Sequence, residues 1–456
     1  MGRRGKRSQK RAGTQVLHRD QPPGIPENSQ GEKRMEANPD RGVDPGTLSG
    51  DFVWQMEAIK QTLLLAEFIT GAAEKQSTDV FKGFARSVGA TEKVEPEGGV
   101  TFAVPPEHRR AADRVYRVVQ TFNRGKGVLA STFLIAAVAE FDVFMAQILR
   151  WIWSVKPGFF GLDEKTITVS ELRQTSDFSG VEEMLLDREI DELLRNSRED
   201  QYDFLEKRLK TPLGSSGERW LEFMEAHERR HLCVHTGGRV SRQYLSACKR
   251  LGIPSELEVG NPLPVTTPYV MRIASVFAEM AVMTAQVIWR KLLGSPNQDA
   301  DSQLVDIPYR LIEDGKYRLA SELLRFAVDN VKDPSSERVR KMWLINLAQA
   351  EKWQGNDEAA LEVIKGEDWS AASLDFQLAV AVLQNRVNDA TALMRQIGTT
   401  GSPSQGDYSD WPLFREFQSS VEFLHTYKEV FKQDFTPKED SAFELKVSFD
   451  PPKRAN

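Results

Sequence analysis

Three of the six histidines lie at four-residue intervals in one short segment, AHERRHLCVH. They are His227, His231 and His235, and a helix would place all three on one face. Imidazole titrates near neutral pH, so a pair of histidines can act as general acid and general base. Arg230 adds a guanidinium group, which binds phosphate through a planar set of donors. The segment therefore has the residues for acid–base chemistry at a phosphodiester, or for binding a metal ion.

The spacing of Arg230, His231 and His235 resembles the signature of the HEPN superfamily (higher eukaryotes and prokaryotes nucleotide-binding). That signature is an arginine, a polar residue, three variable residues and a histidine, late in a helix. The polar residue is often asparagine and sometimes histidine. Further matches follow the motif at Gly238, Val240, Tyr244 and Leu245. The resemblance covers roughly residues 108 to 293, including an earlier apolar helix that carries Glu140.

This resemblance implies a metal-independent endoribonuclease without a cofactor, built on a homodimer whose two motifs face one RNA-binding cleft. In such a reaction the 2′-hydroxyl attacks the neighbouring phosphate, which requires a base for its proton and an acid for the leaving 5′-oxygen. A dimer supplies two copies of His235, and Arg230 stabilises the charge that develops on the phosphate. By the same resemblance His231 orients these groups and Glu140 pairs with Arg230. The resemblance also implies a bacterial toxin or anti-phage defence effector.

One geometric condition applies to the motif. Residues five apart on an ideal helix point about 140° away from each other. Arg230 and His235 therefore converge only if the helix loosens between them or the arginine side chain wraps round. Gly237 and Gly238 follow shortly after His235, and glycine supplies the left-handed conformation that ends a helix. We therefore expect a loosened helix end at this point.

An overlapping motif, residues 227–231, matches the HExxH pattern of zinc metalloproteases. In those enzymes the two histidines bind zinc from one helix face, the glutamate acts as base, and a third protein ligand completes the site. Here His235 lies one turn further on the same helix rather than on a separate element. The sequence also shows no convincing sheet to hold a substrate strand. We therefore expect no metal at this segment.

Two further interpretations leave the motif without catalytic activity. In one, a HEPN-type module serves only as dimer and scaffold, and the C-terminal repeats bind a protein partner. In the other, the segment is a polar surface helix with ordinary histidines. The intact Arg230 and His235 argue against the scaffold, and the further matches that follow the motif argue against the ordinary surface helix.

Apolar residues at three- and four-residue spacing predict an all-α fold over most of the chain. Helices are expected from residue 52, and at 110–122, 131–153, 181–194, 198–209, 219–235 and 269–293. A turn or short extended piece is expected over 94–106. We predict a disordered basic tail at 1–48, a HEPN-like helical domain at 49–297, helical repeats at 298–435 and a polar tail at 436–456.

A weak repeat recurs beyond residue 300. Each time a turn residue is followed five positions later by alanine and then by an aliphatic helix face, at Gly315 and Ala320, Gly355 and Ala360, and Asn385 and Ala390. The pattern resembles tetratricopeptide-type repeats, with a plain helical bundle as the alternative. Stacked helix pairs form concave grooves, so this half is expected to bind a protein partner or an antitoxin.

The composition restricts the compartment and the ligands. The chain has 456 residues, a formal net charge of -6 and two cysteines, too few for a disulfide framework or a four-cysteine zinc site. The best membrane-span candidate, residues 133–153, carries three charged residues and is expected to be a core helix. We therefore expect a cytoplasmic protein without a membrane partner, whose RNA contacts come from local basic patches. The basic segment MGRRGKRSQKR is expected to be a solvated tail rather than a phosphate-binding arm.

Overall fold

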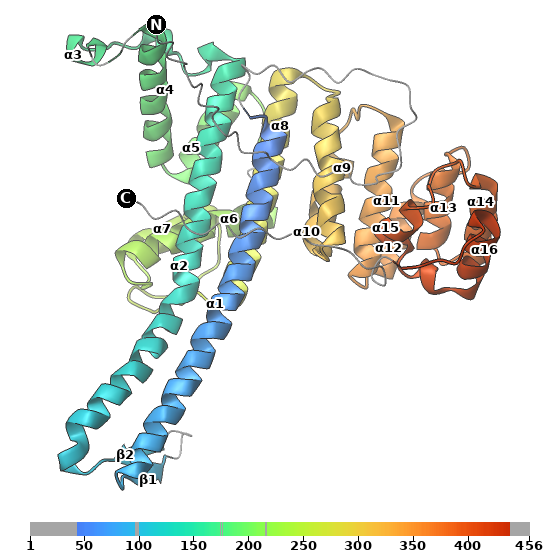
Figure 1. Cartoon of the computed structure of the whole chain (residues 1–456). Coiled ribbons are helices and arrows are strands. Elements are labelled where there is room, and N and C mark those ends of the chain that lie inside the picture. The colour runs from blue at the N-terminus through green and yellow to red at the C-terminus, as the bar shows by residue number, and fades with distance from the viewer. Residues whose placement is uncertain (1–42, 96–99, 174, 176, 215–216, 438–456) are drawn as a thin grey trace, which may run out of the picture. The chain divides into compact units, whose positions relative to one another are not determined.

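The structure is a computed structural model that describes residues 43–95, 100–173, 175, 177–214 and 217–437. Helices make up most of these residues, which confirms the all-α prediction (Figure 1). The expected tails at 1–48 and 436–456 lie almost entirely outside the described residues. At the inner end of the first tail, however, a helix already begins at Pro45.

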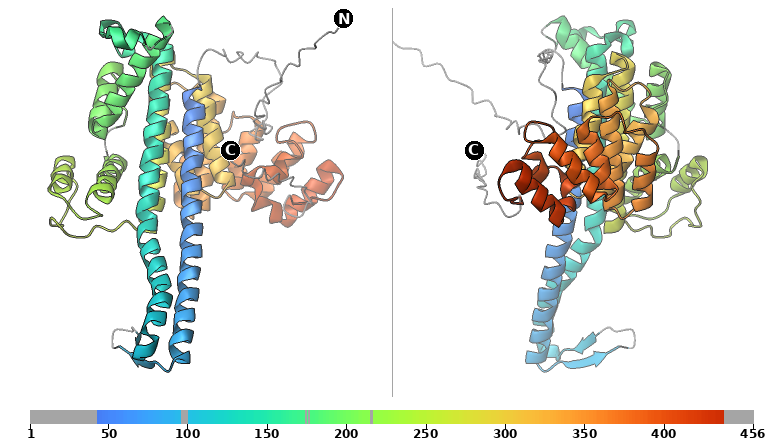
Figure 2. Two further views of the ribbon diagram at one scale, coloured as in Figure 1. Left: turned by 60° about the vertical axis from the view of Figure 1, so that its left-hand side comes forward. Right: turned by 90° about the vertical axis from the view of Figure 1, so that its right-hand side faces the viewer.

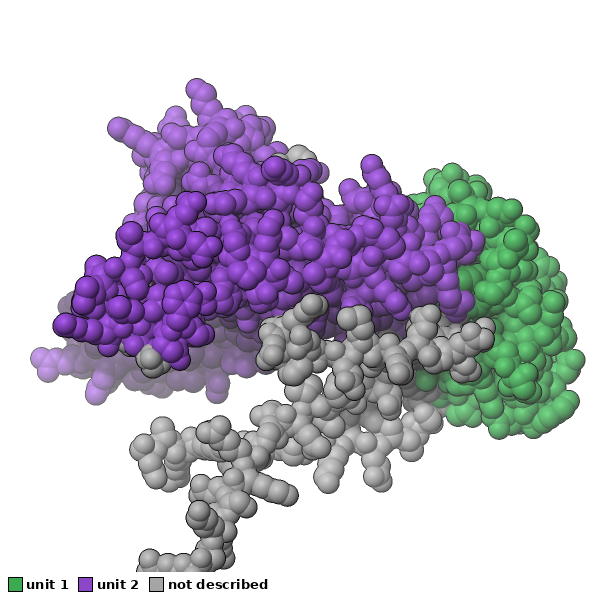
Figure 3. Space-filling view, turned by 90° about the horizontal axis from the view of Figure 1, so that it is seen from above, with its two compact units in different colours: residues 1–33, 348–456 green, residues 34–347 purple. Residues whose placement is uncertain are grey.

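The chain divides into two compact units between Leu347 and Ala348, which Figure 3 shows in different colours. The division falls within α11 (Glu337–Trp353). The described elements of the larger unit are α1 (Pro45–Ser87), β1 (Thr91–Val94), β2 (Val100–Ala103), α2 (Arg109–Val155), α3 (Val169–Leu172), α4 (Phe178–Arg195), α5 (Arg198–Leu209), α6 (Gly217–His235), α7 (Arg242–Leu251), α8 (Thr267–Leu293), α9 (Gln298–Glu313) and α10 (Tyr317–Asn330). Short 3-10 turns join several of them.

Helices α1 and α2 form a long antiparallel pair joined by the β1–β2 hairpin (Figures 1 and 2). The side chain of Asp44 caps α1 by accepting a hydrogen bond from the Thr47 amide at 3.0 Å. The two strands pair in antiparallel register, with Thr91 opposite Ala103, so the short extended piece expected near residues 94–106 is present. The hairpin end of the pair extends beyond the other helices of its unit (Figure 2).

The sequence predicted two helices where the structure has the single helix α2. Where the second helix was expected to begin, the hydroxyls of Ser131 and Thr132 both donate to the carbonyl of Val128 within the helix, each at 2.9 Å. The glycines at 125 and 127 lie inside the helix. Helix α1 runs alongside α2 through this stretch, and this packing keeps the segment helical despite the low helix propensity of glycine.

Aromatic side chains form the centre of the larger unit. Phe141 of α2 lies 4.9 Å from Phe223 of α6 and 5.6 Å from Phe277 of α8, measured between ring centroids. All three rings are buried. Edge-to-face and tilted aromatic contacts of this kind add to the free energy gained by burying the rings. The core thus fixes α6, which carries the histidines, against α2 and α8.

The domain boundary expected at 297/298 does not coincide with the division between the units. Helix α9 belongs to the larger unit because its first turn is bound to α8 by an ion pair and a hydrogen bond. The fully buried carboxylate of Asp301 pairs with Arg290 at 2.7 Å and accepts a hydrogen bond from the Ser335 amide. The side-chain amide of Gln286 donates to the carbonyl of Ala300 at 2.9 Å. Gly294 therefore ends a helix without ending a compact unit.

The smaller unit begins at Ala348 and its described part ends at residue 437. After the end of α11 it contains α12 (Asp357–Lys365), α13 (Leu374–Leu383), α14 (Val387–Ile397), α15 (Asp407–Asp410) and α16 (Val421–Phe431). The rings of Tyr408, Phe414 and Phe423 are fully buried in this unit and pack against one another. It therefore has a hydrophobic core of its own.

The weak sequence repeat corresponds to three turns of the same kind. Gly315, Gly355 and Asn385 each join two consecutive helices, and each has a positive φ, of 71°, 85° and 56°. The alanines five residues later, Ala320, Ala360 and Ala390, are all buried. The turn residue permits the left-handed backbone, and the small side chain permits close packing of the next helix.

Among the residues that the structure describes, two helical stretches are long and apolar enough to cross a membrane, residues 106–155 and α8. The apolar window of α8 is 72% buried within the protein, and that of the first stretch is 39% buried. Core helices of soluble proteins pass the same test, so the expectation of a chain without a membrane partner stays a prediction.

Candidate functional site

Helix α6 holds the candidate residues because one of its faces is anchored in the core. Trp220, Phe223, Met224 and Leu232 are buried. After His235 the chain turns back, with the Thr236 and Gly238 amides both donating to the carbonyl of Leu232, at 2.9 and 3.0 Å. Gly237 and Gly238 have φ values of 62° and 76°. The helix end expected at these glycines is thus confirmed.

His231 and His235 lie side by side at this end of α6. Their ring centroids are 4.3 Å apart and the rings are tilted by 43°. His235 is exposed and His231 is partly buried. Partial burial, together with His235 and the positive charge of Arg230, lowers the pKa of His231 below its ordinary value of 6.5. The structure therefore brings together two imidazoles at the surface, at least one of them neutral at pH 7.

Arg230 lies on a different side of the helix from His235. Helix α6 stays α-helical through His235, so the two side chains leave the helix about 140° apart. Arg230 is partly buried, and its Nε has no hydrogen-bond partner in the described structure. Its charge acts on both His227 and His231. The helix does not loosen between Arg230 and His235, since it ends only after His235.

Glu140 lies on α2 and is partly buried. No ion pair forms between Glu140 and Arg230 in the described part of the chain. The acid of α2 that meets an arginine is Asp142, whose carboxylate pairs with the guanidinium of Arg198 on α5. The expected contact of Glu140 is therefore replaced by one between residues that the sequence did not single out.

Arg198 also reaches the third histidine. Its Nε donates to Nε2 of His227 at 3.0 Å, and its guanidinium lies over the Phe141 ring at 5.0 Å. The other nitrogen of His227, Nδ1, bonds to the carbonyl of Phe223 at 2.8 Å. Burial and the charge of Arg198 hold the pKa of His227 well below its ordinary value. His227 is thus a neutral histidine that packs against the core, and it does not belong to the surface pair of His231 and His235.

These contacts weaken the zinc alternative, because both ring nitrogens of His227 already have partners. Zinc requires an unprotonated ring nitrogen directed at the metal. Among the residues that the structure describes, no group of three His, Cys, Asp or Glu side chains is arranged to hold a metal ion. Burial also raises the pKa values of Cys233 and Cys248, which are both free thiols.

A partly buried carboxylate, that of Glu225, links α6 to α7 and α8. It accepts hydrogen bonds from the Tyr244 hydroxyl at 2.8 Å and from the Tyr269 hydroxyl at 2.6 Å. Arg229, one turn along α6, donates to the same carboxylate at 2.8 Å and lies over the Tyr269 ring at 4.1 Å. Burial raises the pKa values of both tyrosines. Of this cluster, only the four-residue spacing of Glu225 and Arg229 is visible in the sequence.

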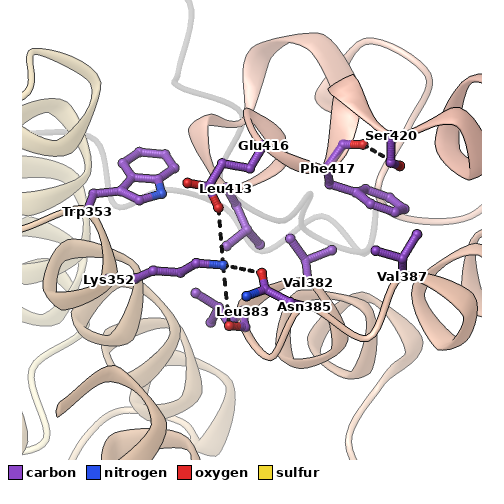
Figure 4. Close-up of a pocket in the computed structure, with 10 residues that line it drawn as sticks. All are labelled: Lys352, Trp353, Val382, Leu383, Asn385, Val387, Leu413, Glu416, Phe417 and Ser420. Atoms are coloured by element: carbon purple, nitrogen blue, oxygen red, sulfur yellow. Dashed lines mark hydrogen bonds and ion pairs between the residues drawn. The ribbon is translucent and has the colours of Figure 1, made fainter. Parts of the chain in front are cut away.

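The smaller unit contains a pocket of about 480 Å³, including its open mouth, lined by residues of α11, α13, α14 and the turns before α16 (Figure 4). The ammonium group of Lys352 lies at its floor. It is bonded to Asn385 Oδ1 at 2.6 Å, to the Leu383 carbonyl at 3.5 Å and to Glu416 at 3.3 Å. These contacts join α11 to α13 and to the turns before α16, so we assign Lys352 a structural role in this unit.

No protein-family model, curated protein or solved structure matches this chain. The resemblance of residues 108–293 to the HEPN superfamily therefore stays a prediction from the motif. The functional assignment depends on the geometry at the end of α6.

Proposed function

We propose that this chain is a metal-independent HEPN-type endoribonuclease that cuts RNA by attack of the 2′-hydroxyl. The observation that carries the proposal is the contact between the His231 and His235 rings, whose centroids are 4.3 Å apart, in the last turn of the helix that also carries Arg230. Cleavage of this kind requires proton transfer and stabilisation of phosphate charge, and both kinds of group are present at this helix end.

The environment of each residue suits one role. The exposed ring of His235 can reach a substrate and exchange a proton with it. His231 is a positioning residue, since its lowered pKa favours a neutral ring that can accept a hydrogen bond from His235. Arg230 pairs with no carboxylate in the described structure, so its guanidinium is available to a phosphate.

Because Arg230 and His235 diverge, the proposed site requires two copies of the chain. In one chain the two side chains point about 140° apart. In a homodimer, Arg230 of one copy and His235 of the other can contact the same phosphodiester. A dimer also supplies two exposed imidazoles, one for the base and one for the acid.

The helix pairs joined at Gly315, Gly355 and Asn385 support a tetratricopeptide-like assignment for the C-terminal half. We propose that these pairs bind a protein partner, such as an antitoxin, and that the enzyme acts in the cytoplasm as a toxin or defence effector. The positive φ at all three turns and the buried alanines after them support the repeat assignment.

The test is cleavage of a labelled RNA by the purified full chain in the presence of EDTA. We expect the wild type to cut, and Arg230→Ala and His235→Ala to lose at least about a hundredfold in rate, the range typical of acid–base groups. His425→Ala is the matched control, because His425 is also exposed on a helix but lies in the smaller unit. Cleavage that survives His235→Ala, or that EDTA abolishes, contradicts the proposal.

The main competing function is a non-catalytic scaffold. Arg230 and His235 diverge within one chain, and without a dimer they form no site. A preparation that is homodimeric yet leaves every RNA intact would favour the scaffold. Sedimentation of the same sample separates these outcomes, since the scaffold predicts a dimer without cleavage.

A further inference from the structure

A row of arginines follows the part of α2 that extends from the core toward the hairpin. Arg110, Arg114, Arg117 and Arg124 are all exposed. Their successive spacings are four, three and seven residues, so they lie along one face of the helix. With a rise of 1.5 Å per residue, Arg110 and Arg124 are about 21 Å apart along the axis. We call this set the arginine row.

The arginine row has no acidic partner within the protein. Among the described residues, no carboxylate makes an ion pair with any of the four, and the one recorded contact is from Arg117 Nε to the carbonyl of Asp113 at 3.2 Å. Two other cations of the long pair of helices do have acidic partners, Lys126 with Glu74 and Arg86 with Glu92 of β1. Asp113 lies on the same face, but in the described structure its carboxylate forms no ion pair with the row. Four exposed cations beside a single acid indicate an anionic ligand from outside the chain.

The local charge balance gives the same indication. Residues 109–139 contain six basic residues and a single acid, Asp113, in a chain whose net charge is -6. The facing part of α1, residues 64–87, carries three acids and three basic residues. The positive charge is therefore concentrated on α2 rather than spread over both helices of the long antiparallel pair.

We propose that the arginine row binds the phosphodiester backbone of RNA. A backbone is a linear series of single negative charges, which matches a linear series of guanidinium groups, and Arg binds phosphate by paired N–H donors. Contacts of this kind position a nucleic acid without reading its sequence. The choice of RNA rests on the proposed ribonuclease function: the row would hold a strand whose other part reaches His235.

The test measures binding apart from cleavage. All variants carry His235→Ala, and binding of a fluorescent, unstructured RNA of about 30 nucleotides is followed by anisotropy in EDTA at several KCl concentrations. The test variant is Arg114→Gln, Arg117→Gln and Arg124→Gln together. The matched control replaces three exposed cations of α4 and α5, Arg195, Lys207 and Lys210, by Gln. Both sets lower the net charge by three, so whole-chain charge is held equal.

We expect the test variant to bind RNA about tenfold more weakly than the control. The slope of log K against log salt should fall by roughly 2, since each lost phosphate contact on a single strand contributes about 0.7. Replacing the same three arginines by lysine should restore most of the binding, because the charge remains; this variant also guards against a folding defect. Equal binding by the test variant and the control overturns the proposal.

A second arm of the experiment distinguishes RNA from a lipid surface. Vesicles containing phosphatidylserine replace the RNA, and bound protein is measured by co-sedimentation. If the arginine row is required for vesicle binding and RNA binding is unchanged, the ligand is lipid and the proposal is wrong. If the row binds RNA but the wild-type chain cuts none, the ribonuclease proposal fails and this inference stands.

Discussion

The Nε–H of Arg198 donates a hydrogen bond to Nε2 of His227 at 3.0 Å. Nδ1 of the same ring lies 2.8 Å from the carbonyl of Phe223 and donates its proton there. A neutral imidazole in one tautomer satisfies both contacts. A protonated ring would direct a second N–H at the guanidinium group and lose the bond. This relationship explains the lowered pKa of His227 and gives the first prediction.

We expect the free energy of unfolding to fall as the pH is lowered below about 6.5. The unfolded chain protonates His227 near its ordinary pKa of 6.5, whereas the folded chain resists protonation. The unfolded state therefore binds more protons in this range. The free energy of unfolding should fall by up to about 1.4 kcal/mol for each unit of pH. Urea unfolding of the wild type and His227→Gln between pH 5 and 8 measures the slope. It should be flatter in His227→Gln and unchanged in His425→Gln; equal slopes in all three would contradict this account.

The second prediction concerns Glu225, which accepts from two tyrosines and an arginine. Glu225→Gln removes the charge that these donors surround and leaves the partly buried Arg229 without its carboxylate. We expect the free energy of unfolding to fall by about 3 kcal/mol, as for a broken buried ion pair. Denaturant titration measures the free energy of unfolding of the variant and of the wild type. Glu192→Gln, at an exposed position on α4, should change it by less than about 0.5 kcal/mol; similar losses in both variants would deny Glu225 this role.

The third prediction contrasts glycines at open and crowded helix positions. A Cβ added at Gly125 or Gly127 would meet no heavy atom within 4 Å of the described structure. Gly125→Ala and Gly127→Ala should each stabilise the protein by about 0.5 to 1 kcal/mol, because alanine loses less entropy in a helix. At Gly46 the added carbon would lie 2.5 Å from both Gln303 and Trp289, so Gly46→Ala should destabilise. Thermal unfolding measures the three variants. A higher unfolding temperature for Gly46→Ala than for Gly125→Ala and Gly127→Ala would contradict the packing at Gly46.

The fourth prediction uses the buried carboxylate of Glu279. Burial, with Glu322 and Glu222 nearby, raises its pKa to about 7 despite an ion pair with Arg219 at 3.4 Å. The folded chain therefore holds a proton that the unfolded chain releases near pH 4.5, and this contribution to stability is lost as the pH rises through 7. Glu279→Gln should be more stable than wild type at pH 8 by up to about 3 kcal/mol, with a smaller difference at pH 5.5. Denaturant unfolding at pH 5.5 and pH 8 measures this difference in stability, with the exposed Glu183→Gln as control. If the difference between Glu279→Gln and wild type is the same at both pH values, Glu279 does not titrate as proposed.

The sequence by itself determined the features that depend on near neighbours. Apolar spacing predicted the helices, the glycine pair after His235 predicted the end of α6, and the recurrence of turn residue and alanine predicted the turns at Gly315, Gly355 and Asn385. Each of these follows from backbone freedom or from the periodicity of one helix, and such properties are written in a few consecutive residues.

Tertiary structure alone decided which distant groups meet. Arg198 and His227 are 29 residues apart, and Glu225 and Tyr269 are 44 apart, so no local pattern records their contacts. Glu140 and Asp142 lie two residues apart on one apolar helix and so point about 160° away from each other. Asp142 pairs with an arginine only because the tertiary structure places Arg198 of α5 beside it. The same packing decides that α2 continues through its glycines, because a neighbouring helix can outweigh a weak local propensity.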